Sequence, residues 1–222
     1  MTVSVGTDFG RRSDRTCSVK VEGDPLRMRL VQMDLCEQAR WNDLVIRARN
    51  VGKGADIHLA DATGVGDALY EHIPGAIGIV HTGKQHEPFR DLPGNRISVV
   101  KSTLYLPVVS AIHSRGLTVD CEVPPHFRQE LLKFSSKITR TGHIKLEASS
   151  GHDDTISALA LALFGLYLRE IRYGHSYEEE QHPSAPAAVS SGGPVHNEPR
   201  GEPQPRSVRF GRRSPLGRIG AR

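Results

Sequence analysis

Acidic residues stand at the ends of three predicted core elements. Asp8 closes a short β-branched run at the N-terminus, and Asp61 closes the apolar run 56–60. Asp153 and Asp154 open a long apolar segment, 152–173. Carboxylates that converge repel one another unless a cation lies between them, and the hard ions Mg²⁺ and Mn²⁺ prefer such oxygen ligands. Two such ions can activate a water molecule and stabilise the leaving oxygen of a phosphodiester, so the pattern indicates a metal-dependent nuclease.

Each of these residues also has a purely structural interpretation. Asp8 before Phe9-Gly10 suits a turn, and Asp61 before a helix suits an N-cap. Asp153 and Asp154 suit the positive end of a helix dipole, and His152 suits a capping or solvated position. The nuclease interpretation therefore requires that the three acidic positions converge in the fold.

The N-terminal segment predicts three strands, over residues 2–8, 16–22 and 26–35, in which apolar and polar side chains alternate. A polar turn joins the first two, and Gly23-Asp24-Pro25 joins the second to the third. Such short links favour antiparallel neighbours.

From residue 37 the apolar spacing becomes helical, with Trp41 expected in the core. A strand over 56–60, a short helix over 65–73 and a strand over 76–81 follow, which implies parallel pairing and a right-handed crossover. The first and fourth strands can then lie side by side, with Asp8 and Asp61 at the same edge.

The remaining elements alternate again between helix and strand. Pro107 predicts a kink or a later start in the first of these helices. The last helix buries the stripe Ala158–Leu168. The whole chain predicts an α/β fold, a mixed sheet of three antiparallel strands and then parallel strands, with helices on both faces. The expected elements are a helix over 101–115, an edge strand over 117–122, a helix over 125–134, a hairpin over 138–148 and a helix over 152–173.

Charge is unevenly distributed along the 222 residues, whose net charge is +4. Residues 200–222 contain seven arginines and one acid, so residues 1–199 carry −2. Residues 178–222 are rich in Pro and Gly and poor in large apolar side chains, which predicts disorder. The expected organisation is one folded domain over 1–177 and a tail over 178–222 with a basic end.

Other classes of protein are excluded by length and composition. The longest apolar run, Ala158–Leu168, has 11 residues, whereas a membrane span needs roughly 20. The N-terminus has no pattern of a secretory signal. Cys17, Cys36 and Cys121 lie far apart and fit neither a disulfide framework nor a zinc site, which favours reduced thiols in a cytosolic protein.

Four segments resemble the nuclease domain of phage terminase large subunits in their order and spacing. They are VGTDFGRRSDRT, DIHLADATGVGDALYEHI, VVKSTLYLPVVSAI and GHDDTISALALAL. The most specific parts are DATGVGD and GHDDxxxALALA. The resemblance spans about residues 3–170. It implies a ribonuclease H-like fold and a two-metal endonuclease that cuts concatemeric viral DNA in the bacterial cytoplasm.

The resemblance also implies a set of metal ligands. Asp8, Asp61 and one of Asp153 and Asp154 form the triad on this interpretation; adjacent helical residues diverge by about 100°, and Asp154 is the preferred one of the pair. His152 is expected as an auxiliary ligand. Asp14 corresponds to an extra acid found in some family members, although the arginines around it also suit a surface turn.

Two departures from the family pattern bear on the interpretation. The phosphate-binding sequence Gly-x-x-x-x-Gly-Lys-[Ser/Thr] does not occur in this sequence, so a separate ATPase motor and a portal or procapsid are expected partners. Phe9 stands where a small residue or proline is common in the family; it would either crowd the site or pack beneath it.

Double-stranded DNA is the expected substrate, and the tail supplies candidate phosphate contacts. Lys101, before a helix near the expected DNA side, is a further candidate. A solvated tail and a solvated lysine are the structural alternatives. The candidate tail residues are Arg206, Arg209, Arg212, Arg213 and Arg218.

Three other functions compete with the nuclease. An actin-like kinase or ATPase would need two such domains and gives no role to Gly151-His152-Asp153-Asp154. A Holliday-junction resolvase also uses acids at strand ends, but the −2 charge of residues 1–199 does not favour it. A non-catalytic packaging scaffold would account for the missing motor sequence, but not for the presence of all four acids.

Overall fold

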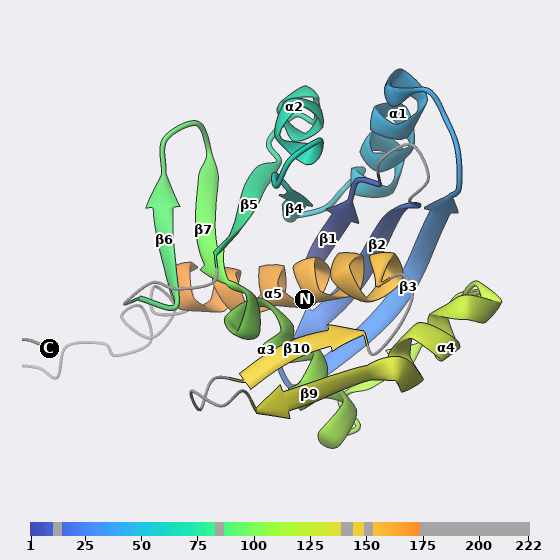
Figure 1. Ribbon diagram of the computed structural model, residues 1–222, viewed down its shortest axis with the longest axis vertical. Helices are drawn as coiled ribbons and strands as arrows, with labels where there is room; N and C mark the ends of the chain where they lie inside the picture. Colours follow the sequence, from blue (N-terminus) through green and yellow to red (C-terminus); the bar gives the residue numbers. More distant parts are fainter. Residues whose placement is uncertain (11–14, 83–86, 139–143, 149–152, 174–222) are drawn as a thin grey trace, which may run out of the picture. The chain divides into compact units, whose positions relative to one another are not determined.

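An eight-stranded mixed sheet forms the centre of the chain (Figure 1). The computed structural model describes residues 1–10, 15–82, 87–138, 144–148 and 153–173, and gives only the backbone of 135–138 and 144–148. All of these residues belong to one compact unit, Met1–Pro183. The strands of the sheet are β1 (Thr2–Asp8), β2 (Thr16–Asp24), β3 (Arg27–Cys36), β4 (Ile57–Asp61), β5 (Ile77–Thr82), β6 (Phe89–Leu92), β7 (Arg96–Val100) and β8 (Leu117–Val119).

The strand order is β6-β7-β5-β4-β1-β2-β3-β8. Strands β1, β2 and β3 pair antiparallel, whereas β1, β4, β5 and β7 run parallel. The predicted fold class and the pairing of the first and fourth strands are therefore confirmed. Strands β6 and β7 have no counterpart among the predicted elements, because β6 is only four residues long and lies between Pro88 and Pro93.

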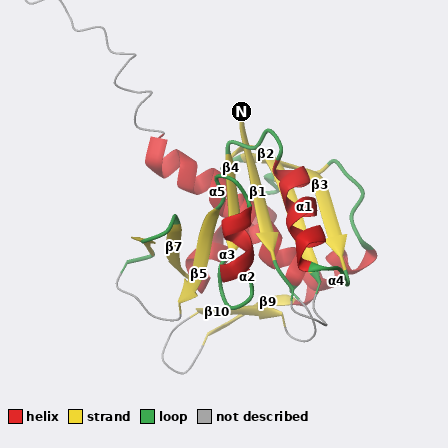
Figure 2. Cartoon of the chain, turned by 90° about the horizontal axis from the view of Figure 1, so that it is seen from above, coloured by secondary structure: helices red, strands yellow, loops and turns green. Residues whose placement is uncertain are grey.

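Helices cover both faces of the sheet, as the sequence predicts (Figure 2). On one face α1 (Trp41–Gly52) and α2 (Gly66–Leu69), which continues into the 3₁₀ turn η1 (Tyr70–His72), pack over β1 to β4. On the other face α5 (Asp154–Tyr173) lies on β1, β2 and β4 with α3 (Lys101–His113) beside it. Helix α4 (Pro125–Lys133) leads into a separate antiparallel pair, β9 (Phe134–Ile138) and β10 (Ile144–Ala148).

Helix α5 is the centre of the larger core. Ala158–Leu168 is buried along almost its whole length, as predicted, because each turn faces either the sheet or α3. Two glycines allow the close approach. A Cβ on Gly6 of β1 would lie 2.1 Å from the carbonyl oxygen of Ala158, and one on Gly165 would lie 2.2 Å from Oγ of Ser4. This contact sets the height at which α5 crosses β1.

One local prediction is wrong, and one of the two alternatives predicted for Pro107 is excluded. Trp41 is 53% exposed, because it is the first residue of α1 and the helix buries the face that carries Leu44 and Val45. Helix α3 begins at Lys101 and continues through Pro107, so the later start is not observed. Among the described residues, none of the helices combines the length and apolar character that crossing a membrane requires.

Candidate metal centre

Asp8 and Asp61 end two neighbouring parallel strands. The register pairs Thr7 of β1 with Ala60 of β4, so the next residue on each strand is a carboxylate at the same level. Side chains alternate between the faces of a sheet. Gly6 lies against α5, and Asp8, two residues further, leaves the sheet on that face. The same alternation from the core residue Leu59 places Asp61 on the α5 face as well.

Asp153 and Asp154 bring two more carboxylates to this edge from the start of α5. Asp154 is buried and Asp153 is half-buried. The pKa of Asp8 is raised well above its usual value, first by burial and then by the charges of Asp61, Asp154 and Asp153. The other three predicted acids are therefore all close enough to Asp8 to raise its pKa.

Ser157 and Tyr105, which are hydrogen-bonded to each other, lie next to the Asp8 carboxylate. Ser157, one turn into α5, bonds to Asp8 and opposes the rise in its pKa. Oγ of Ser157 lies 2.7 Å from the phenol oxygen of Tyr105 on α3, and burial raises the pKa of that phenol. Nζ of Lys101 lies 5.5 Å from the centre of the Tyr105 ring. Lys101, exposed at the start of α3, is therefore at the rim of the carboxylate cluster.

Glu130 of α4 is a site residue that the sequence did not reveal. Its side chain is 6% exposed, and Oε2 accepts hydrogen bonds from the backbone amide of Thr155, at 3.1 Å, and from its hydroxyl. Oε1 lies 3.8 Å from Nη1 of Arg15. Glu130 thus fixes the turn of α5 that carries Asp153 and Asp154. A lone glutamate on an amphipathic helix carries no signal of such a contact.

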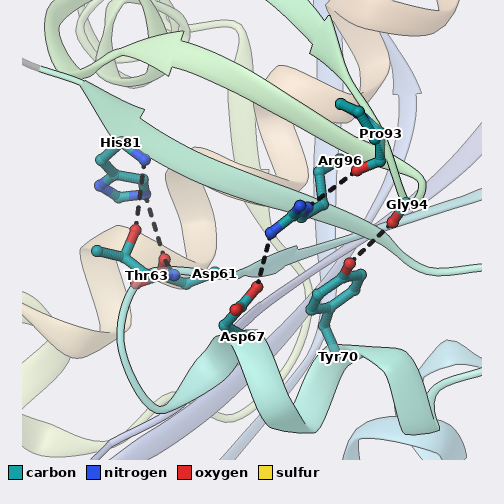
Figure 3. Close-up of polar contacts among 8 residues, drawn as sticks. All are labelled: Asp61, Thr63, Asp67, Tyr70, His81, Pro93, Gly94 and Arg96. Carbon is teal, nitrogen blue, oxygen red and sulfur yellow. Dashed lines mark hydrogen bonds and ion pairs between the residues drawn. The ribbon is translucent and has the colours of Figure 1, made fainter.

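His81, at the end of β5, is the second residue that sequence reasoning missed (Figure 3). Its Nε2 lies 3.8 Å from Oδ1 of Asp61, and its backbone amide donates to Oγ1 of Thr63 at 3.3 Å. Burial lowers the pKa of His81; Asp61 and Asp153 oppose this, and Lys101 adds to it. The signal that could have found it is its position at the end of the next parallel strand after the one that Asp61 closes.

The loop after Asp61 is held in a fixed conformation. Oδ1 of Asp61 accepts a hydrogen bond from the amide of Thr63 at 2.7 Å, so its local role is that of a turn residue. The alternative of an N-cap is wrong, because α2 begins only at Gly66, after Val65. A Cβ on Gly66 would lie 1.8 Å from the carbonyl oxygen of Asp61, which accounts for a glycine there.

Contacts further along α2 and η1 attach them to the hairpin of β6 and β7 (Figure 3). Asp67 pairs with Arg96 at 3.3 Å, and the hydroxyl of Tyr70 donates to the carbonyl of Gly94 at 2.8 Å. Both ends of the loop that follows Asp61 are thereby anchored.

The carboxylate side chains of this site suit a divalent cation chemically, although those that the structure describes lie too far apart to surround one. Within the described ranges, the side chains form no group of three or more His, Cys, Asp or Glu donors close enough to hold a metal ion. The pKa of Asp8 is raised first by burial and then by repulsion from the neighbouring carboxylates. A cation between them would remove that repulsion. Asp14, His152 and the tail arginines lie outside the described residues.

No protein-family model matches the sequence, and no curated protein matches it. Solved structures do match the fold. One is the large terminase nuclease from thermophilic phage G20c, with a TM-score of 0.52 and 24% identity over 72% of this chain and 80% of that one. The chain has the fold of a phage terminase nuclease domain.

Two further structures of this kind carry metal ions. The same phage G20c nuclease with bound magnesium matches with a TM-score of 0.52 and 22% identity, covering 73% of this chain and 80% of that one. A mutant nuclease domain of the large terminase subunit of bacterial virus Sf6, solved with manganese and beta-thujaplicinol, matches with a TM-score of 0.54 and 15% identity. The match covers 73% of this chain and 88% of that one. The predicted resemblance to terminase nuclease domains is confirmed at the level of the fold.

Proposed function

We propose that this chain is a metal-dependent endonuclease that cleaves double-stranded DNA, as the nuclease part of a viral or prophage packaging terminase. The observation that carries the proposal is that Asp8, Asp61, Asp153 and Asp154 lie at one edge of the sheet, where burial and then the charges of the other three raise the pKa of Asp8. The fold shared with terminase nuclease domains, some of them solved with magnesium or manganese, supports it.

In this proposal Asp8 and Asp61 would hold the two Mg²⁺ or Mn²⁺ ions, and Asp154 would complete the site, with Asp153 as the alternative. His152 serves as an auxiliary ligand, and Asp14 is a further candidate. Two such ions supply an activated water molecule and stabilisation of the leaving oxygen of the phosphodiester. Ser157 orients the Asp8 carboxylate, and Glu130 holds the start of α5 in place.

Basic residues are proposed to bring DNA to a site that is itself acidic. Lys101 stands at the rim of the carboxylate cluster, where it can pair with a phosphate. The arginines of residues 200–222 add sequence-independent contacts whose strength falls with salt. Removing residues 200–222 is expected to weaken DNA binding and flatten its dependence on salt; unchanged affinity at low salt would rule the tail out. A separate ATPase motor and a portal or procapsid are the proposed partners.

Plasmid cleavage tests the activity. The full chain is incubated with supercoiled DNA in Mn²⁺, Mg²⁺ or EDTA, beside Asp8→Ala and Asp61→Ala. The control is Asp43→Ala, which removes an exposed acid on α1. Nicking or linearisation is expected in metal for the wild type and the control, and none for the two site variants. Retained cleavage in Asp8→Ala or Asp61→Ala would refute the assignment.

A thermal shift with Mn²⁺ separates the nuclease from the packaging scaffold. A metal-binding site raises the unfolding temperature of the wild type, because the ion binds the folded state only. A folded protein that shows neither cleavage nor a shift would favour the scaffold. A shift without cleavage would indicate a nuclease that acts only with its motor.

A further inference from the structure

His81 lies one strand beyond the two acids, on the same face of the sheet. The register pairs Asp61 of β4 with Ile79 of β5, and Ile79 belongs to the core beneath α5. His81, two residues further, therefore leaves the sheet on the side of α5. Its side chain is 19% exposed, as is that of Asp61.

Nε2 of His81 is buried, and among the described residues it makes no hydrogen bond. The distance from Nε2 of His81 to Oδ1 of Asp61 is 3.8 Å, which is longer than a hydrogen bond. Leaving a buried ring nitrogen unpaired costs free energy, so the position calls for a partner. Oδ1 of Asp61 accepts its hydrogen bond from the amide of Thr63 instead.

The separation of these two atoms suits two ligands of one metal ion. Imidazole nitrogens bind such ions at about 2.0–2.1 Å and carboxylate oxygens at about 2.0–2.2 Å, so two donors of one ion lie at most ~4.3 Å apart. The 3.8 Å between Nε2 and Oδ1 falls within that span. A cation between these two atoms would give the buried nitrogen of His81 a partner.

The backbone keeps the two donors in this relationship. The amide of His81 donates to Oγ1 of Thr63, and the amide of Thr63 donates to Asp61 (Figure 3). The ends of β4 and β5 are thereby linked through Thr63. Metal sites with such pre-set ligands need little rearrangement to bind.

We propose that His81 is a nitrogen ligand of the metal ion held by Asp61, and that it sets the metal preference of the site. This rests on the proposed nuclease function. An imidazole ligand favours later transition-metal ions such as Co²⁺ and Zn²⁺ over Mg²⁺, Ca²⁺ and Mn²⁺, which suit oxygen ligands. The four carboxylates alone would make an oxygen site suited to Mg²⁺ or Mn²⁺; His81 would make it a mixed site in which Co²⁺ binds more tightly.

Pulsed electron paramagnetic resonance of Mn²⁺ bound to the full chain tests the ligand directly, because an imidazole nitrogen on the ion modulates the echo. His81→Phe keeps a ring of similar size without a nitrogen, and His81→Ala is the second variant in case the first does not fold. His72→Ala is the matched control, since His72 is exposed on η1. His152→Ala separates the other candidate nitrogen in the same spectrum.

The nitrogen modulation is expected to be unchanged in His72→Ala, to remain in His152→Ala, and to weaken in both His81 variants. By calorimetry, the loss of His81 is expected to reduce Co²⁺ affinity by roughly tenfold or more and to change Mg²⁺ affinity much less. Equal modulation in wild type and His81→Phe, with Mn²⁺ still bound, would overturn the role of His81 and leave the nuclease proposal standing. If the wild type binds no Mn²⁺, or if Asp61→Ala binds it as well as the wild type does, both proposals fail.

Discussion

Glu130 and Thr155 join the helix before the small β9–β10 sheet to the helix that carries two of the acids. A single carboxylate oxygen of Glu130 accepts from both the amide and the hydroxyl of Thr155. The first amides of a helix lack partners inside it, so a buried acceptor from another element both satisfies and locates this end of α5. The start of α5 is therefore fixed relative to α4, and with it the two carboxylates that face Asp8.

Replacing Glu130 with Ala is expected to lower the free energy of unfolding by about 1–3 kcal/mol, because the amide and hydroxyl of Thr155 lose their buried partner. Urea unfolding measures the change. Gln129→Ala is the control, because Gln129 is exposed on the same helix and of similar helix propensity. Glu130→Gln keeps one acceptor oxygen and should lose less than Glu130→Ala. Equal stability of the Glu130→Ala and Gln129→Ala variants would show that the contact contributes nothing.

Asp8→Asn is expected to stabilise the metal-free protein. The carboxylate is costly to ionise in its place, since burial and three neighbouring acids all raise its pKa. Asparagine keeps an acceptor for Ser157 without the charge. A gain of about 0.5–2 kcal/mol in EDTA, the usual range for a stabilising substitution, would appear in urea unfolding. Mn²⁺ should stabilise the wild type more than the variant. A variant less stable than wild type in EDTA would contradict the electrostatic account.

Ser157→Ala tests the support of Asp8. Its hydrogen bond lowers the pKa of Asp8, so its removal raises that pKa further and the carboxylate ionises only at higher pH. Mn²⁺ affinity is expected to fall 10–100-fold, as for other partners that orient a metal ligand, and the rise of cleavage with pH should move upward. Tyr105→Phe should have a smaller effect, because it acts through Ser157. Tyr167→Phe, which removes a phenol bonded to the carbonyl of Pro25, serves as control. The same pH profile in wild type and Ser157→Ala would exclude this role.

The sequence predicts that the acids of this site end or begin neighbouring core elements, because that signal is local. A strand that ends in Asp can be recognised from its own segment of the sequence alone. The same holds for a helix that starts with two Asp residues. Parallel pairing then follows from the link between the segments, since a strand, a helix and a strand return the chain in the same direction. The register of β1 and β4 places Asp8 and Asp61 at the same level, as that argument requires.

The missed residues depend on contacts between distant segments. Glu130 and Thr155 are 25 positions apart, and nothing in either segment specifies the other. His81 can be recognised as a candidate only once β5 is known to lie beside β4, which carries Asp61. The prediction that Trp41 is buried is wrong for a different reason. Helical spacing shows that one face is apolar, but at the first turn it does not show whether the sheet reaches that far.

His58 makes the stability of the fold depend on pH. It lies on β4, on the face opposite Asp61, with Nε2 2.9 Å from Oγ1 of Thr7. Burial lowers its pKa from 6.5 to about 4. The unfolded chain therefore binds a proton that the folded chain refuses between these values. As pH falls from 6.5 to about 4, the free energy of unfolding should decrease by about 3 kcal/mol.

Urea unfolding of wild type and His58→Gln near pH 7.5 and pH 4.5 tests this dependence. The variant loses the hydrogen bond to Thr7 at both pH values, so its stability is lower throughout, but it lacks the titrating ring. The stability gap between wild type and variant is therefore expected to narrow at the acidic pH. His72→Gln removes an exposed histidine and should keep the wild-type slope. Carboxylates that titrate in the same range contribute to all three proteins and cancel in the comparison. A gap that stays constant would mean that His58 takes up its proton in the folded state as readily as in the unfolded chain.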